Sequence, residues 1–251
     1  MQYLFPQLAE QGVDLYLKLE NMQNTGSFEL RGVVNQIAKI KSRMSNQNHR
    51  TKFVTNSAVN FGKAFGYVLQ QRSLLGVCIM PDSSSQSKME RIKCHGVKVE
   101  LCPATEIQSR VDRYVAENEY HYCDSNDDRD LMAGYSSIGL EILEALPEFD
   151  ILLICCEGGG LPAGVSAAIR SKLKRTCCQI YAIESESSPT MFEKILNATK
   201  KLFDVGLIVE PSGSAAMAAL LSNKIPDVKF KKVVVIVSGG NITPDELKEL
   251  I

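Results

Sequence analysis

The sequence lacks a strong net charge and any cysteine pattern typical of a metal site. Lys and Arg number 28 against 29 Asp and Glu, for a formal net charge of −1. Such a balance gives no electrostatic reason to expect nucleic acid or an anionic membrane as a partner. The eight cysteines include no C-x-x-C pair and no cysteine–histidine cluster with zinc spacing. We interpret them as small buried hydrophobic residues.

The sequence also has no apolar run near the length of a membrane span. Its first residues lack the basic-then-apolar build of a signal peptide. We therefore expect a cytoplasmic protein. With 251 residues, 45% of them hydrophobic, the chain is long enough to form a sizeable core in one domain or two small ones.

Strand-like and helix-like stretches alternate along the chain, which predicts an α/β fold with open, mostly parallel sheets covered by helices. The last three predicted strands are apolar at consecutive positions, which is typical of strands covered on both faces. Two helices are predicted at 164–173 and 212–222, and Gly96 is expected to end another. Strands are predicted at 13–19, 52–55, 75–80, 97–102, 151–156, 179–183 and 233–237.

Two lobes are expected, one of them inserted in the other. Boundaries near 50–52 and 104–107 assign residues 1–50 and 104–251 to a large lobe. Residues 51–103, with a neighbouring helix, form the small lobe.

Two glycine-containing turns follow predicted strands, and ligands of open α/β sheets bind at the carboxyl ends of strands. Residues 157–164 read EGGGLPAG, and residues 238–241 read SGGN. Consecutive glycines let backbone N–H groups converge on an anion at a helix N-terminus. Each turn taken alone is equally consistent with a tight connection that binds nothing.

The order of these turns with residues 24–32, NTGSFELRG, resembles the serine racemase and threonine dehydratase family. That family belongs to fold type II of the pyridoxal-phosphate enzymes and carries a T-G-S-F-K-x-R-G lysine motif. Its second motif, S-S-G-N-H-G-Q-A, corresponds here to SAVNFGKA at 57–64. Further landmarks are MPD at 80–82 with Lys88, and VEPSG at 209–213. The resemblance extends from about 13 to 241 and implies a tryptophan synthase beta-like architecture with two lobes.

The departures from the family pattern fall on its chemical residues. Glu29 stands at the position of the Schiff-base lysine, and a carboxylate cannot supply the amine that the cofactor needs. Ala58 stands at the position of the catalytic serine and has no proton to give. No substitute lysine adjoins Glu29 in its motif, so the resemblance leaves no catalytic residue to assign.

The expected phosphate loop is also altered, because Glu157 replaces the first of four glycines. A carboxylate about 4 Å from a phosphate costs up to roughly 4 kcal/mol per pair of unit charges at an effective dielectric near 20. Two conformations stay open for Glu157. Its side chain either folds back to cap the following helix or turns to solvent.

Part of the cofactor site is retained by resemblance. Phe28 corresponds to the residue packed near the ring, Asn60 to the one beside the pyridoxal hydroxyl, and Ser238 to the partner of the ring nitrogen. Gly158, Gly159 and Gly160 remain of the phosphate loop. Phe28 equally suits a core position, and Asn60 and Ser238 suit turns after strands.

Two further features bear on the large lobe. Glu184 corresponds to a carboxylate that helps hold a divalent ion in serine racemases, but the second carboxylate of that site falls near Thr190. Since hard cations need several oxygen ligands, we expect no metal. The family also carries a considerably longer stretch, with an additional helix and strand, between positions 185 and 209.

The leading hypothesis is a pseudoenzyme, a protein that keeps the family's core and has lost its catalysis, with no bound cofactor. Its role would be binding or regulatory, toward an unknown partner protein or a homologous subunit, and a homo-oligomer is expected. One alternative is a residual pyridoxal-phosphate-dependent racemase or dehydratase acting through Lys63, the nearest lysine in a site motif. Another is a small-molecule sensor that uses the old cleft.

Overall fold

The computed structural model describes residues 5–44, 51–57, 59–173, 178–185 and 189–250, which form two compact units. The first unit comprises Met1–Phe28 and Ser136–Ile251, and the second comprises Glu29–Tyr135. One unit is thus inserted in the chain of the other. The boundaries at 28/29 and 135/136 differ from those expected near 50–52 and 104–107.

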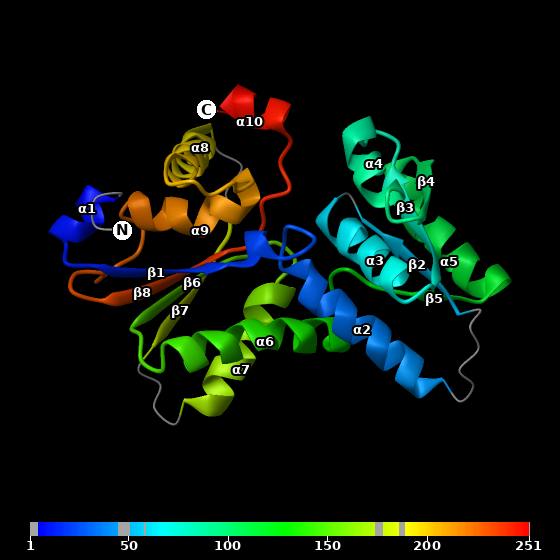
Figure 1. Ribbon diagram of the computed structural model, residues 1–251, viewed down its shortest axis with the longest axis horizontal. Helices are drawn as coiled ribbons and strands as arrows, with labels where there is room; N and C mark the ends of the chain where they lie inside the picture. The colour runs from blue at the N-terminus through cyan, green and yellow to red at the C-terminus, as the bar shows by residue number, and fades with distance from the viewer. Residues whose placement is uncertain (1–4, 45–50, 58, 174–177, 186–188, 251) are drawn as a thin grey trace. The chain divides into compact units, whose positions relative to one another are not determined.

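The first unit is built on a parallel four-stranded sheet with the order β1-β8-β6-β7. Figure 1 shows α8 and α9 on one face of this sheet and α6 and α7 on the other. The strands are β1 (Asp14–Leu19), β6 (Ile151–Cys155), β7 (Gln179–Ile183) and β8 (Lys232–Val237). The helices are α1 (Pro6–Glu10), α7 (Gly160–Lys172), α8 (Pro189–Asp204), α9 (Pro211–Leu221) and α10 (Pro244–Leu250), with the short η1 (Glu20–Met22) and the C-terminal part of α6 (Arg129–Ala145).

The two central strands of this sheet are its most apolar segments. The first four residues of β6 are buried, as are the last five of β8, because helices cover both faces. β7 differs from expectation: it lies at the edge of the sheet, and its five residues are exposed or only partly buried. The runs of consecutive apolar residues therefore correctly predicted burial on both faces for β6 and β8, and the same prediction was wrong for β7.

The second unit contains another parallel sheet, with the order β4-β3-β2-β5. Its strands are β2 (Lys52–Asn56), β3 (Leu75–Pro81), β4 (Lys98–Cys102) and β5 (Tyr120–Tyr122). Its helices are α2 (Glu29–Arg43), α3 (Asn60–Gln71), α4 (Gln86–Lys93) and α5 (Ile107–Asn118), with the short η2 (Ala104–Glu106) and the first residues of α6.

Tertiary packing explains why this unit is larger than residues 51–103. The helix α5 packs on the second sheet, where Val111 joins a buried cluster with Val54 and Ile79. β5, a strand that apolar periodicity did not reveal, pairs with β2. At the other end α2 packs against α3. These contacts hold the segments on either side of 51–103 in the same unit.

The described cysteines behave as buried hydrophobic residues rather than as cross-links. No disulfide joins any of those that the structure describes, and Cys78, Cys102 and Cys123 are buried. Burial raises the pKa of the Cys78 thiol to about 12, so this thiol stays protonated at neutral pH. Among the described helices, none is long and apolar enough to span a membrane.

Candidate functional site

The two glycine-containing turns lie at the same edge of the first sheet. Gly158–Gly160 follows β6, and Ser238 follows β8. β6 and β8 are parallel neighbours, with Leu153 opposite Val235, so their carboxyl ends adjoin. Both turns thus lie at carboxyl ends of strands, as predicted, and the two strands are neighbours in the sheet. This is the edge at which open α/β sheets bind ligands.

The segment before Glu29 lies against the second of these turns. The Phe28 N–H donates a 3.0 Å hydrogen bond to the Ser238 carbonyl, and Ser27 forms an antiparallel bridge with Gly239. The Asn241 side-chain amide donates to the Thr25 carbonyl at 2.9 Å. Phe28 and Ser238, far apart in sequence, are therefore neighbours.

The glycine turn after β6 keeps the backbone of an anion site. Gly159 has φ +83°, a conformation that favours glycine, and a Cβ there would meet no atom within 4 Å. The helix α7 begins at Gly160, and Gly159, at its N-cap, provides no side-chain hydrogen bond. The N-terminal N–H groups of a helix and its dipole favour an anion. Gly158 and Gly159 thus retain a cradle that a phosphate would fit.

Glu157 does not cap this helix. Its side chain is exposed, and it forms no hydrogen bond with any residue in the described part of the chain. Of the two conformations that sequence left open, the structure has the one turned to solvent. The repulsion between Glu157 and a bound phosphate is consequently weaker than the buried-pair limit, because water and salt screen an exposed charge.

Sequence reasoning missed the thiol beside Ser238. The Cys155 thiol donates to the Gly213 carbonyl at 3.8 Å and accepts a hydrogen bond from the Ala216 N–H at 3.4 Å. Burial raises the pKa of the Cys155 thiol, while the Ala216 N–H and the nearby Ser238 hydroxyl lower it in part. A thiol held by the first residues of α9 thus stands beside Ser238 at the carboxyl end of β6.

Glu210 is a second residue at this edge that sequence reasoning did not assign to the site. It is the N-cap residue of α9, and its N–H donates to the Gly239 carbonyl at 3.1 Å. A Cβ at Gly239 would lie 2.1 Å from Glu210 Oε1, so this carboxylate occupies the space beside Gly239. The signal available in sequence was the landmark VEPSG at 209–213, which indicated the family but not the contact.

Two buried hydroxyls mark the loop before Phe28. Thr25 and Ser27 have no exposed surface, and neither Thr25 Oγ1 nor Ser27 Oγ has a hydrogen-bond partner among the described residues. Buried hydroxyls are normally hydrogen-bonded. The loop at 24–28 therefore has more hydrogen-bonding capacity than the described residues use.

In the second unit, Glu29 is the first residue of α2. A carboxylate is stabilised at a helix N-terminus, where the dipole favours negative charge. Burial raises the pKa of Tyr135 well above its usual value, and the negative charges of Glu29 and Asp128 raise it further. Glu29 thus places a negative charge at the start of α2, beside a buried phenol.

The second motif begins the helix α3. The Gly62 N–H donates to Ser57 Oγ at 2.8 Å, Val59 is the N-cap residue, and Asn60 is the first residue of the helix. Asn60 is partly buried at the carboxyl end of β2. Ala58, the expected substitute for the catalytic serine, lies outside the described residues.

Lys63, the lysine of the alternative enzyme hypothesis, affects the pKa of His95. Partial burial lowers the pKa of His95, and the positive charge of Lys63 lowers it further. The His95 ring also contacts Tyr67 edge-to-face and Gln70 through Nδ1 at 3.0 Å. Lys63, Tyr67 and Gln70 follow one face of α3 at helical spacing, and the effect of Lys63 on His95 places its charge near that side chain.

Glu184 immediately follows β7 and is exposed, as is Thr190 near the start of α8. Within the described ranges, no group of three or more His, Cys, Asp or Glu side chains is placed to hold a metal ion. The absence of a metal stays a prediction for this protein.

The parallel sheets and their covering helices define an α/β class of protein in which ligands ordinarily bind at the carboxyl ends of the strands. Residues 3–197 match the model of the family described as pyridoxal-phosphate dependent enzyme. The chain therefore belongs to the pyridoxal-phosphate dependent enzyme family.

Individual relatives agree with this assignment. The chain is 28% identical to an L-threonine ammonia-lyase of Thermotoga maritima, over 96% of this chain and 70% of that protein. It is 25% identical to a serine racemase of Dictyostelium discoideum, over 96% of this chain and 88% of the relative. The first alignment runs over 292 residues, more than the 251 of this chain, so that relative contains stretches that the chain lacks.

Solved structures show the same fold. A pyridoxal phosphate-dependent aspartate racemase superposes with a TM-score of 0.87 at 22% identity, covering 98% of this chain and 89% of that one. Maize serine racemase superposes with a TM-score of 0.85 at 23% identity, covering 96% of this chain and 88% of that one. The expected α/β architecture of the fold type II enzymes is thus confirmed.

The residues present fit only part of the family's cofactor. Gly158, Gly159 and the start of α7 at Gly160 suit its phosphate, whereas Glu29 cannot form a covalent bond to its aldehyde carbon as a lysine would. Ser238 lies at the same carboxyl edge of the first sheet as the glycine turn. The glycine turn of the first unit therefore suits an anionic group, and Glu29 of the second unit offers no amine for covalent attachment of the cofactor.

Proposed function

We propose that this chain is a member of the family that has lost pyridoxal-phosphate catalysis and acts by binding. The observation that most directly supports this proposal is Glu29, which begins α2 at the position of the attachment lysine. Its relatives are threonine ammonia-lyases and serine racemases, so any residual activity belongs to that reaction class. The chain would then act by binding a partner protein, a homologous active subunit or a second copy of itself.

The preserved packing supports loss of chemistry without loss of folding. The central strands β6 and β8 are buried as those of an intact sheet are, and Phe28 and Ser238 keep their backbone hydrogen bond. A chain that had merely decayed would accumulate polar substitutions in its core. The altered residues instead lie in the motifs that perform chemistry, which favours a folded protein with another task.

The direct test is the visible absorption of the purified protein incubated with pyridoxal phosphate, followed by borohydride reduction and peptide mapping. We expect no covalently held yellow cofactor, and neither racemisation of serine nor ammonia release from serine or threonine. A reduced pyridoxyl group mapped to any lysine, together with turnover, would replace this proposal by that of a residual enzyme. Lys63 is the residue to inspect first.

A second candidate, a sensor of an anionic small molecule, is favoured by the conformation of the glycine turn. Because Glu157 is exposed and does not cap α7, the backbone cradle of Gly158–Gly160 has no intramolecular occupant among the described residues. Reversible, non-covalent binding of pyridoxal phosphate at this turn would support the sensor. Binding unaffected by Gly159→Val, which opposes the φ of +83°, would place the ligand elsewhere.

A further inference from the structure

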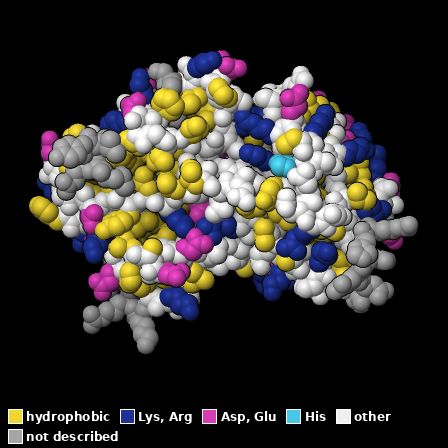
Figure 2. Space-filling model, viewed as in Figure 1, with side chains coloured by type: hydrophobic (Ala, Val, Ile, Leu, Met, Phe, Trp, Pro, Cys, Tyr) yellow, Lys and Arg dark blue, Asp and Glu magenta, His cyan; other side chains and the backbone are white. Residues whose placement is uncertain are grey.

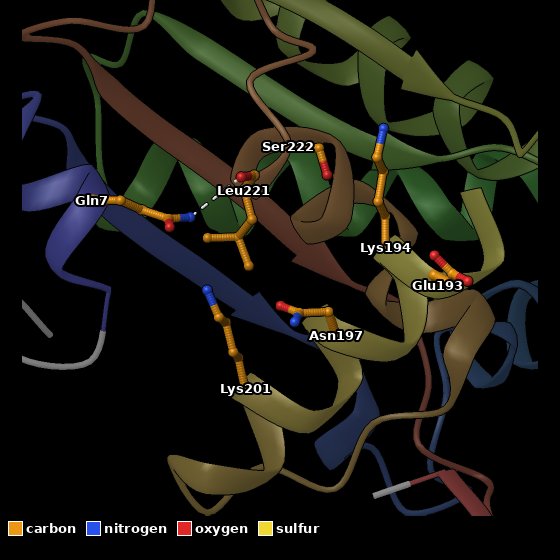
Figure 3. A pocket seen from close by; sticks show the side chains of 7 residues that line it. All are labelled: Gln7, Glu193, Lys194, Asn197, Lys201, Leu221 and Ser222. Carbon is orange, nitrogen blue, oxygen red and sulfur yellow. Dashed lines mark hydrogen bonds between the residues drawn. The ribbon is translucent and has the colours of Figure 1, made fainter. Parts of the chain in front are cut away.

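A polar pocket lies in the first unit, away from the glycine turns. It has a volume of about 220 Å³ and lies where α1, α8 and the C-terminal end of α9 meet (Figure 3). No residue of the family motifs lines it. Its lining residues are Gln7, Glu193, Lys194, Asn197, Lys201, Leu221 and Ser222.

Three of these side chains follow one face of α8. Lys194, Asn197 and Lys201 are spaced by three and four residues, so they lie on successive turns. Figure 3 shows Lys201 and Asn197 directed toward the space beside Leu221, with Glu193 directed away from it. Lys194 also lines the pocket, and Figure 3 shows its ammonium directed past Ser222 and away from Lys201.

These donors are not used within the described part of the chain. Lys194 and Lys201 are partly buried, and neither forms a hydrogen bond or an ion pair with a residue that the structure describes. The Leu221 carbonyl already accepts a 3.3 Å hydrogen bond from the Gln7 amide. Because a lysine ammonium has three donors and no acceptor, the pocket offers an excess of donors.

We propose that this pocket binds a small organic dianion, such as a phosphate monoester or a dicarboxylate. Its volume of about 220 Å³ lies below the roughly 300–1,000 Å³ of typical ligand pockets, which favours a compact ligand. A bound anion would satisfy the ammonium donors that line the pocket and have no partner among the described residues. The inference does not rest on the proposed function, because no residue of the pocket belongs to the cofactor site.

Exposed apolar side chains also occur on α8, on the face opposite Lys194 and Lys201. Phe192 and Phe203 are 54% and 38% exposed, and neither lines the pocket. In the space-filling view, hydrophobic side chains gather over the part of the first unit that carries α8 and α9 (Figure 2).

A competing role for the lysines is local electrostatics. The C-terminal end of α9, at Leu221 and Ser222, carries a partial negative charge that two nearby lysines would offset without any ligand. In that case their removal would lower the stability of the protein and leave anion binding unchanged. The two roles therefore give opposite results in one experiment.

The experiment is isothermal titration of the full chain with inorganic phosphate and, separately, with succinate at low ionic strength. We expect saturable binding of at least one probe, and a loss of affinity of at least about tenfold in the double variant Lys194→Gln/Lys201→Gln. Lys200→Gln is the charge-matched control, since Lys200 lies on α8 but does not line the pocket. It should keep the affinity of the wild type.

Stoichiometry separates this pocket from the glycine turn after β6. If phosphate binds at both places, the double variant should lose one of two equivalents, and Gly159→Val should lose the other. Equal weakening in Lys200→Gln and in the double variant would reveal general charge attraction and overturn the proposal. It would also be overturned if neither probe bound, or if the double variant bound as the wild type does while unfolding at a lower temperature.

Discussion

Gly213 of α9 packs directly on the backbone of Gly239. A Cβ at position 213 would lie 2.3 Å from the Gly239 carbonyl oxygen and 2.9 Å from its nitrogen. The same carbonyl accepts the hydrogen bond from Glu210 N–H. The contact therefore fixes the start of α9 against the turn that carries Ser238, at the ligand-binding edge of the sheet.

The first prediction concerns this contact. Alanine ordinarily stabilises a helix by about 1 kcal/mol relative to glycine. Gly213→Ala should instead lower the free energy of unfolding by about 2 kcal/mol, because backbone atoms cannot yield as a flexible side chain can. Denaturant unfolding measures this change. Ser212→Ala, at an exposed neighbouring position, should change stability by less than about 0.5 kcal/mol, and a Gly213→Ala variant as stable as the wild type would contradict the predicted clash.

Much of the fold was predictable because apolar periodicity reports which face of a segment is buried. The strands β1, β3 and β6 lie within a residue of their predicted ranges, and Gly96, with φ +78°, follows α4 as expected. β5 was missed since three residues, two of them tyrosine, give no periodic signal. Burial of β7 was overestimated because sequence does not reveal which strand lies at an edge.

The site was predictable only where a motif carried it. The motifs placed Gly158–Gly160 and Ser238 at carboxyl ends of strands, and the structure agrees. Cys155 and Gly213 are far apart in sequence, so no local pattern predicts the hydrogen bond between them. The side-chain direction of Glu157 likewise depends on rotamer and solvation, which propensity rules do not determine.

The second prediction concerns alkaline pH. The folded-state pKa of Tyr135 is raised above 10.0 by burial and by the charges of Glu29 and Asp128. The stability that protonated Tyr135 contributes is therefore fully present below the pKa of Tyr135 in the unfolded chain. This stability is lost as the pH rises from about 10 through the pKa of Tyr135 in the folded protein. The loss for one tyrosine approaches about 1.4 kcal/mol per pH unit in that window. Urea unfolding at neutral pH and at pH above 10, with tyrosinate absorbance, measures it.

Glu29→Gln tests the electrostatic part of that shift. Removing the carboxylate charge should lower the pKa of Tyr135, so that the alkaline loss ends at a lower pH and its total becomes smaller. Glu144→Gln, an exposed substitution of equal charge in the first unit, is the control and should leave the window unchanged. An identical alkaline profile for Glu29→Gln and wild type would show that Glu29 does not contribute to the shift and that burial and Asp128 account for it.

The third prediction is that Glu29→Lys alone restores no substantial turnover of serine or threonine. The variant regains an amine, but Ala58 still lacks a proton to transfer, and positioned acid–base groups contribute about 10²- to 10⁴-fold to a rate. Ammonia release and chiral analysis of serine measure the outcome. The double variant Glu29→Lys/Ala58→Ser should turn over substrate faster than Glu29→Lys if the missing serine at position 58 limits the rate. Strong turnover from Glu29→Lys alone would show that the effect of Ala58 is overrated here.

The last prediction concerns Glu157. Because its side chain is exposed and caps nothing that the structure describes, Glu157→Gly should strengthen non-covalent binding of pyridoxal phosphate by less than about tenfold. A buried carboxylate at about 4 Å would instead give roughly a thousandfold effect, from a repulsion of about 4 kcal/mol. The gain should shrink as salt is added, since the Debye length falls from about 30 Å at 0.01 M to about 8 Å at physiological ionic strength. Equilibrium titration followed by cofactor absorbance measures it, with the exposed Glu148→Gln as the control for overall charge. A thousandfold gain that resists salt would mean that Glu157 turns inward when the ligand binds, and the repulsion would then be a built-in barrier to phosphate.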